Sequence, residues 1–380
     1  MNTNPNHLLR PLSMLLALAV SASAFAATHE RKETVRGAKA RSLSVENLAG
    51  AVKLEPASGN ELTVAFTVVG GGDDAAEAKA LADRIRFETR MDGDRMTIQV
   101  RYPTDEFRSY RYDDGRGGTS NTQSTYMGER VRVSSRSGGA DLHVDAVVQV
   151  PKGASARYSN LVGDIKADKV VGNLDLDTGS GAVTVSNGQG RVDADTGSGE
   201  VMVSDHAGDV DADTGSGDVE LQRVKGDVSA DTGSGEVTLR KVTAARIEID
   251  TGSGGIEIED SSGSLEADTG SGGVRTRNFT AGERIEIDTG SGGARIQGDL
   301  GAVRDLSIDT GSGGVTLDST TPFDLRLHVS VGSGNVDVDA PGMRDVRDEE
   351  DEFEATLGQV RGRAEIETGS GGVRIRVGTR

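Results

Sequence analysis

One pentapeptide, Asp-Thr-Gly-Ser-Gly, occurs eight times without change within residues 177–318. Successive copies start 18 to 21 residues apart, at Asp177, Asp195, Asp213, Asp231, Asp250, Asp268, Asp288 and Asp309. Two degenerate copies follow, Ser330–Gly334 and Glu367–Gly371. Repetition with a period near 20 residues is typical of solenoids, in which each repeat is one structural unit stacked on the next.

Each repeat contains two short stretches in which apolar and polar residues alternate. In the unit Asp195–Ala212, Val201 and Val203 belong to the first stretch, and Val210 and Ala212 belong to the second. Such alternation predicts half-buried strands, and no apolar spacing typical of a helix persists. We therefore predict an all-β fold, a parallel β-solenoid of 18–21-residue rungs stacked about 4.8 Å apart.

The first 26 residues have the pattern of a secretory signal peptide. Arg10 precedes a short apolar run, Leu12–Val20, and Ala24-Phe25-Ala26 forms a cleavage site of small residues. The apolar run is too short to span a bilayer. The chain has no cysteine, so disulfides and lipidated cysteines are excluded. We expect a periplasmic or extracellular protein, with or without cell-surface attachment and without a transmembrane anchor.

The rest of the chain divides by composition. Residues 27–158 lack the pentapeptide and are predicted to form an N-terminal cap region with strands and one helix, Asp74–Ile85, which starts in a capping box. A hairpin is expected to turn at Asp92–Asp94. The remaining segments are predicted to be the repeat array 159–339, an acidic insertion 340–363 and a terminal rung 364–380. We expect the first region and the last two to cover the open ends of the array.

Residues 103–130 are predicted to form a long polar loop within the cap region. Aromatic and basic residues are interleaved in it, namely Phe107, Arg108, Tyr110, Arg111, Tyr112, Arg116 and Tyr126. Such residues could stack on bases or sugar rings. A surface loop without a specific ligand is the simpler interpretation.

Stacking places equivalent residues in columns, and two neighbouring columns are acidic. The first contains the aspartate that opens each pentapeptide. The second contains Asp175, Asp193, Asp211, Glu248, Glu266 and Glu286. Carboxylates about 4.8 Å apart repel one another, and no basic columns are expected beside them. We therefore expect some of these groups to titrate above the usual value of about 4.

This acidity limits the expected partners. Residues 159–340 sum to −19, which equals the net charge of the whole chain. Phosphates would be repelled, which argues against nucleic acid. Calcium could relieve the repulsion with oxygen ligands, so a calcium-binding structural repeat protein is one alternative. The chain lacks the Gly-Gly-x-Gly-x-Asp pattern of calcium β-rolls, and we assign no cofactor and no metal ligand.

The pentapeptide also has a structural interpretation. The aspartate is expected to accept backbone N–H groups in an Asx-turn, and the two glycines are expected to allow positive φ. Asp-Thr-Gly-Ser is also the signature of aspartic proteases, whose chemistry needs two buried carboxylates that share a proton. Eight copies side by side along one open edge cannot form that pair.

No catalytic residue is assigned. The five histidines, His7, His29, His143, His206 and His328, have no ligand spacing. A carbohydrate-active enzyme resembling a polysaccharide lyase is a second alternative, because such enzymes are built on β-helices. Its basic residues would be Arg275, Arg277 and Arg295.

Several features together resemble a bacterial adhesin family, an uncharacterised β-strand repeat domain of exported or envelope proteins. These are the signal peptide, the helix-bearing N-terminal region, the strand that ends in Val150-Pro151-Lys152-Gly153, and the Gly-x-Val-x-Val repeats with Thr-Gly-Ser-Gly turns. The resemblance covers residues 40–377. It implies an exported, non-enzymatic β-solenoid that acts as an adhesin-like or envelope interaction surface for an unknown protein or polysaccharide. It brings no functional residues with it.

Overall fold

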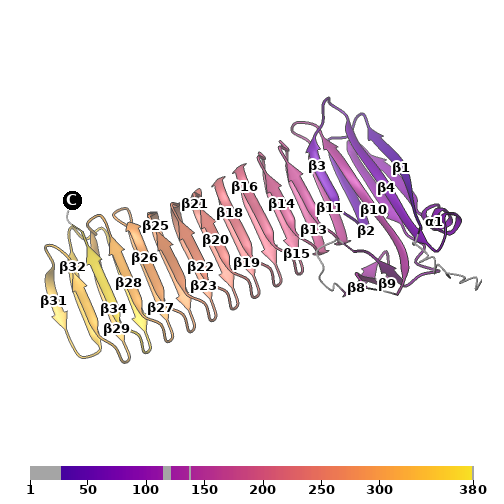
Figure 1. Ribbon diagram of the computed structural model, residues 1–380. Coiled ribbons are helices and arrows are strands. Elements are labelled where there is room, and N and C mark those ends of the chain that lie inside the picture. The colour runs from indigo at the N-terminus through magenta and orange to yellow at the C-terminus, as the bar shows by residue number, and fades with distance from the viewer. Residues whose placement is uncertain (1–26, 114–120, 137, 379–380) are drawn as a thin grey trace, which may run out of the picture.

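The computed structural model describes residues 27–113, 121–136 and 138–378. This part of the chain contains 34 strands and one α-helix, arranged as an elongated stack (Figure 1). The expected signal peptide, residues 1–26, lies outside the described residues. None of the helical structure in the described ranges is long and apolar enough to cross a membrane.

Each repeat contributes one strand to each of two parallel sheets, which we call sheet 1 and sheet 2. Sheet 1 contains, in spatial order, β6 (Arg95–Arg101), β2 (Ser42–Ala49), β11 (Ser155–Val162), β13 (Leu174–Ser180), β15 (Val192–Thr196), β17 (Val210–Thr214), β19 (Val228–Thr232), β21 (Thr243–Thr251), β23 (Ser262–Thr269), β25 (Phe279–Thr289), β27 (Asp305–Thr310), β33 (Gly362–Thr368) and β29 (Leu325–Val331).

Sheet 2 contains the other strand of each rung. Its parallel strands are β3 (Val52–Pro56), β12 (Ile165–Asp168), β14 (Val183–Ser186), β16 (Val201–Ala207), β18 (Val219–Lys225), β20 (Val237–Arg240), β22 (Ile256–Glu259), β24 (Val274–Arg277), β26 (Ala294–Asp299), β28 (Val315–Ser319), β34 (Val373–Val377) and β30 (Val336–Asp339). The prediction of a parallel β-solenoid is therefore confirmed.

The core is a set of columns of small and branched apolar side chains. On sheet 2, Val183, Val201, Val219, Val237 and Ile256 lie directly above one another and are all fully buried. One rung contributes only a few such residues, so its apolar side is covered only by the rungs on either side. The 18-residue period thus fixes which side chains are inside, and it turns every outward position into a column as well.

The parallel stack begins earlier in the chain than the pentapeptides suggest. Strand β2 pairs with β11, with Asn47 opposite Asn160, and β3 pairs with β12, with Val52 opposite Ile165. Beyond β3, sheet 2 continues through β10 (Ala140–Val150), which is parallel to β3, and then through the antiparallel strands β4 (Leu62–Gly72) and β1 (Ala27–Gly37). Part of the N-terminal cap region is therefore solenoid.

The hairpin and the helix lie at the N-terminal end of the stack. Strand β5 (Arg86–Asp92) pairs antiparallel with β6, as expected, and covers the end of sheet 1. Helix α1 (Ala75–Ala82) packs on β4 and β1. Its N-cap Asp74 accepts hydrogen bonds from the N–H groups of Ala76 and Glu77 at 2.8 and 2.9 Å. The helix ends three residues before the expected Ile85.

The expectation of a loop at residues 103–130 is wrong. This segment contains β7 (Ser109–Arg111), β8 (Asn121–Tyr126) and the start of β9 (Glu129–Ser134). Tyr110, Tyr112 and Tyr126 are only 0, 7 and 4% exposed, so they are core residues and cannot stack on a ligand. Tyr110 and Tyr126 each pack edge-on against the buried Tyr102, so large aromatic side chains fill the core at this end of the molecule. Arg116 lies outside the described residues.

The expected order of the C-terminal segments is also wrong. The last rung in sequence, β33 and β34, is not last in space, because β33 lies between β27 and β29 and β34 lies between β28 and β30. The end of sheet 1 is covered by the insertion, whose strand β32 (Glu352–Leu357) pairs antiparallel with β29 and with β31 (Arg344–Asp348). The strands β33 and β34 are thus held between two other rungs.

The thin core predicts a sharp difference between inward and outward substitutions. Val219→Asp buries an unpaired charge and is expected to lower the free energy of unfolding by about 3 kcal/mol or more. Met202→Ala, on the outer face of the neighbouring strand, is expected to cost less than about 1 kcal/mol. Urea unfolding monitored by circular dichroism measures both values. Equal losses would mean that the inward and outward faces have been assigned the wrong way round.

Candidate functional site

The most regular surface of the molecule is the outer face of sheet 1, which we call the acidic face. The aspartates of the eight pentapeptides lie in register there, and Glu367 of the intercalated rung extends the column. The second expected column lies two residues earlier on each strand, with Ser229 interrupting its row of carboxylates. Each carboxylate comes from a rigid strand, so the spacing of the charges is set by the spacing of the rungs.

The corner beside the aspartate column is closed by threonine. The Thr214 hydroxyl donates to the Gly199 carbonyl of the preceding rung at 2.9 Å and accepts the N–H of Gly217 at 3.0 Å. The hydroxyls that donate to the preceding rung in this way belong to Thr178, Thr196, Thr214, Thr232, Thr251, Thr269 and Thr368. The expected Asx-turn is not part of this hydrogen bonding, because the threonine hydroxyl and not the aspartate carboxylate accepts the N–H group at this corner. The aspartate side chains are directed outward.

The glycines of the pentapeptide allow the backbones of neighbouring rungs to approach closely. A Cβ atom on Gly217 would lie 1.7 Å from the Gly199 carbonyl oxygen, and one on Gly199 would lie 1.7 Å from that of Gly181. Neither Gly199 nor Gly217 has a left-handed φ, so the expectation that positive φ explains them is wrong. One left-handed non-glycine residue recurs at another corner of successive rungs, with φ of 51 to 58°, at Lys169, Asn187, Asp205, Arg223, Lys241, Asp260 and Asn278.

The second acidic column is partly neutralised, contrary to expectation. Arg191 lies 3.1 Å from Asp211, and Arg246 lies 3.1 Å from Glu248 and 3.0 Å from Glu266. Further ion pairs on this column join Arg157 to Asp175 and Arg284 to Glu286. By contrast, within the described ranges none of the eight pentapeptide aspartates forms an ion pair with Lys, Arg or His.

The unneutralised column has perturbed acidity. Partial burial, together with the charges of Asp211, Asp231, Asp195 and Asp193, raises the pKa of Asp213 to about 6. Partial burial and neighbouring carboxylates also raise the pKa values of Asp195, Asp231 and Asp268. Loss of water around the carboxyl is the larger cause in each case, and repulsion along the column adds to it.

The geometry does not favour calcium. Within the described ranges no group of three or more His, Asp or Glu side chains is arranged to hold a metal ion. Calcium takes six to eight oxygen ligands, whereas the first column supplies one carboxylate per rung. The histidines do not provide a site either, since His206 is buried in a corner with Nε2 2.7 Å from the Gly190 carbonyl oxygen, and His7 lies outside the described residues.

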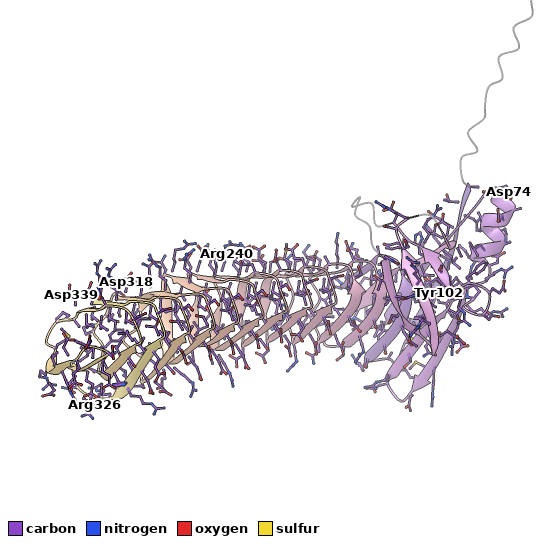
Figure 2. All side chains as sticks on the ribbon, turned by 90° about the horizontal axis from the view of Figure 1, so that it is seen from below. Asp74, Tyr102, Arg240, Asp318, Arg326 and Asp339 are labelled. Atoms are coloured by element: carbon purple, nitrogen blue, oxygen red, sulfur yellow. The ribbon has the colours of Figure 1, made fainter. Side chains whose placement is uncertain are left out.

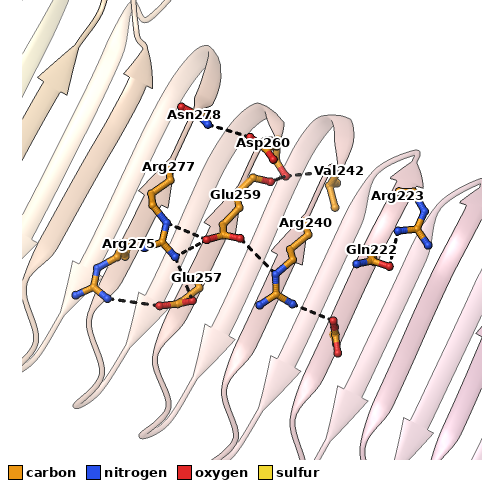
Figure 3. Close-up of polar contacts among 12 residues, drawn as sticks. Gln222, Arg223, Arg240, Val242, Glu257, Glu259, Asp260, Arg275, Arg277 and Asn278 are labelled. Atoms are coloured by element: carbon orange, nitrogen blue, oxygen red, sulfur yellow. Dashed lines mark hydrogen bonds and ion pairs between the residues drawn. The ribbon is translucent and has the colours of Figure 1, made fainter.

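The outer face of sheet 2 has a different chemistry (Figure 3). Arg240 lies 2.9 Å from Glu220 and 3.4 Å from Glu259, and Arg277 also pairs with Glu259. Exposed ion pairs of this kind contribute little stability each. Two of the three arginines considered for a lyase, Arg275 and Arg277, are thus paired with glutamates, and they are not aimed at a shared reacting centre.

Comparisons with known proteins place most of the chain in a family. Residues 34–302 match the model of a protein family described as Toastrack DUF4097. A crystal structure from Clostridium sporogenes, provisionally described as that of a cell adhesion protein, matches with 9% sequence identity and a TM-score of 0.18, over 92% of this chain and 100% of that chain. A likeness this distant carries no argument about fold or function. No curated protein matches the sequence.

The raised pKa of Asp213 predicts a pH-dependent gain from removing its charge. Because the folded-state pKa of about 6 lies above the unfolded value, ionisation of Asp213 disfavours the fold as pH rises through about 6. Asp213→Asn is therefore expected to raise the Tm at pH 7 by about 1 °C, with the gain vanishing below about pH 4.

Asp205→Asn is the matched control for that measurement. Hydrogen bonding to Arg223 lowers the pKa of Asp205, so its charge favours the fold at neutral pH. Asparagine tolerates the left-handed backbone at this position, where φ is 53°. Thermal unfolding of both variants between pH 4 and pH 7 should therefore show no gain for Asp205→Asn, and an equal gain for both would contradict the assignment.

Proposed function

The chain belongs to the Toastrack DUF4097 family, and from its architecture we propose that it is a non-enzymatic, adhesin-like scaffold whose acidic face binds a cationic partner. This membership confirms the resemblance to an uncharacterised adhesin-like repeat family that the sequence indicates. The partner, the role of the acidic face and export from the cytoplasm are parts of the proposal.

The observation that carries the proposal is the unpaired aspartate column. Adjacent carboxylates about 4.8 Å apart repel by about 1 kcal/mol in water and by more near a protein surface. The chain neutralises part of the second column with its own arginines but leaves the eight aspartates without an ion pair inside the described ranges. A cation from outside would relieve this repulsion, so the face is suited to binding one.

The arrangement supports a basic protein segment over a metal ion. A single file of carboxylates offers one acidic group about every 4.8 Å, and the long, flexible side chains of a lysine- or arginine-rich segment can reach such a row without a closed coordination shell. A calcium ion needs a closed set of six to eight oxygens. The second column adds specificity, because arginines neutralise the negative surface at defined rungs, including those of Arg191, Arg246 and Arg284.

A decalysine peptide tests the proposed binding. We expect its affinity to fall by about tenfold or more when Asp195, Asp213, Asp231 and Asp250 are all changed to Asn, because four central charges of the column are lost. The affinity of the unchanged protein should also weaken as salt rises, since screening shortens the range of the field. Isothermal titration calorimetry measures both effects.

The control variant removes the same number of charges elsewhere. Glu349→Gln, Glu350→Gln, Asp351→Asn and Glu352→Gln together change four carboxylates in and before β32, which lies beyond β29 at the C-terminal end of sheet 1, several rungs from the four central aspartates. This variant has the same net charge as the column variant. If both variants lose the same affinity, the peptide senses only overall charge and the acidic face is not the binding site.

Export is the remaining part of the proposal. The pattern of residues 1–26 predicts removal of a signal peptide. Expression of the full chain in a bacterium should yield a periplasmic or secreted form that begins at Ala27. N-terminal sequencing of the protein recovered from each compartment checks this. Recovery of only the uncleaved cytoplasmic chain would remove export from the proposal.

A further inference from the structure

The outer face of sheet 2 contains a groove that the acidic face does not explain. It encloses about 600 Å³ and crosses the rungs of β22, β24, β26 and β28. Its side chains include Glu236, Glu257, Arg275, Arg295 and Thr316. Figure 2 shows that this face, marked by Arg240 and Asp318, lies opposite the face that carries Arg326. The groove is therefore separate from the aspartate column.

The groove exists because side chains are missing from one column. The residue after each pentapeptide is Ala182, Glu200, Asp218 or Glu236 in the first four copies, and it is glycine in the last four. Those glycines are Gly255, Gly273, Gly293 and Gly314. Each glycine carbonyl accepts a hydrogen bond from the first strand residue of the preceding rung, as Gly273 does from the Ile256 N–H, and these bonds keep the glycines in register. A row of partly exposed backbone thus forms the floor of the groove.

The earlier rungs show what the amides of this column bind. The Glu236 N–H donates to Asp218 Oδ1 at 2.8 Å, and the Ala182 N–H donates to Asp164 Oδ1 at 3.0 Å. In both pairs a carboxylate of the preceding rung is the acceptor. The N–H groups of Gly273, Gly293 and Gly314 have no acceptor among the described residues, because the residue before each in the column is itself glycine. They are open to a carboxylate from a ligand.

A free cation lies beside these amides. Arg295 is in register with Arg275 and is exposed, and within the described ranges it forms no ion pair. Arg275 is 3.4 Å from Glu257 and so is already paired. A guanidinium next to unpaired backbone N–H groups provides charge-assisted hydrogen bonds for a carboxylate. We propose that this groove binds the carboxylate groups of a uronate-containing polysaccharide.

The lining favours a glycan over a peptide. Peptide grooves supply apolar pockets for anchoring side chains, whereas this groove is mainly polar and has no aromatic lining residue among those described. Glu236, Glu257 and Thr316 offer acceptors and a donor for sugar hydroxyls. The groove crosses successive rungs, so it presents the same backbone groups at intervals of about 4.8 Å to a linear polymer.

The negative charge of the chain does not prevent this binding. The acidic face belongs to the other sheet, and at an ionic strength of about 0.15 M exposed charges are screened beyond about 8 Å. The field at the groove is therefore set by its own side chains, where two arginines, Arg275 and Arg295, stand beside two carboxylates, and Glu257 is already paired with Arg275. The inference does not depend on the function proposed for the acidic face, since the two surfaces share no residue.

Binding of an oligogalacturonate to the full chain, measured by isothermal titration calorimetry at about 0.15 M salt, tests the proposal. Arg295→Gln removes the free cation. Gly255→Asp places a carboxylate where it reaches the Gly273 N–H, as Asp218 does for Glu236. A Cβ atom at Gly255 meets only the Gly273 oxygen at 3.8 Å, so the substitution fits. Each variant is expected to weaken binding by about tenfold or more.

Two control variants should bind as the unchanged protein does. Gly255→Ala adds a side chain without a carboxylate, and Arg326→Gln removes an exposed arginine from sheet 1. Absence of binding, or binding that survives both Arg295→Gln and Gly255→Asp, would overturn the proposal. Equal binding of a neutral oligogalactan would overturn carboxylate recognition, and equal binding of polyglutamate would overturn the assignment to a glycan.

Discussion

At one corner of most repeat rungs, a threonine hydroxyl donates to a glycine carbonyl of the rung before it and accepts an N–H of its own rung, as Thr214 does. The contact requires glycine on both sides, because a Cβ atom on Gly217 would overlap the carbonyl of Gly199. This corner fixes the vertical register of the stack. Every column of the molecule, apolar or charged, depends on it.

The same register that builds the core also produces the acidic face. Stacking identical residues stabilises the inward columns, such as Val201, Val219 and Val237, because apolar side chains bury one another. It destabilises the outward aspartates, because like charges repel. The chain offsets the loss on one column with arginines and leaves it on the other, where the pKa of Asp213 rises to about 6. A purely structural repeat would gain nothing from that arrangement, which is why we assign it to binding.

Much of the fold follows from periodicity in the sequence. The 18-residue step determines which residues pair. It also accounts for the contact between Arg191 and Asp211, which lies one rung and two residues further along the chain and so on the same face of the sheet. The helix cap at Asp74 and the hairpin at residues 86–101 also have local signals. The likeness of residues 45–52 to residues 160–165 could have placed the start of the stack at β2.

Other features have no local signal. Strand β33 lies between β27 and β29, although its sequence would pair equally well at the end of sheet 1. Its position depends on which strand edges the other rungs leave unpaired. Burial of Tyr110 and Tyr126 depends on packing at the wide end of the molecule. The groove is not predicted from the sequence, because a glycine next to a turn is interpreted as a turn residue. The residue after the pentapeptide nevertheless changes from Glu236 to Gly255, Gly273 and Gly293 in successive repeats.

We infer that the pentapeptide aspartates form a coupled set that the protein itself does not neutralise. Carbon-13 NMR titration of the side-chain carboxyl resonances measures this directly. We expect Asp213 to titrate near 6 and its column neighbours to titrate above the usual value for aspartate, with broad, coupled curves. Addition of a basic peptide should shift these titrations to lower pH. Independent titration of the whole column near about 4, unaffected by the peptide, would contradict the account.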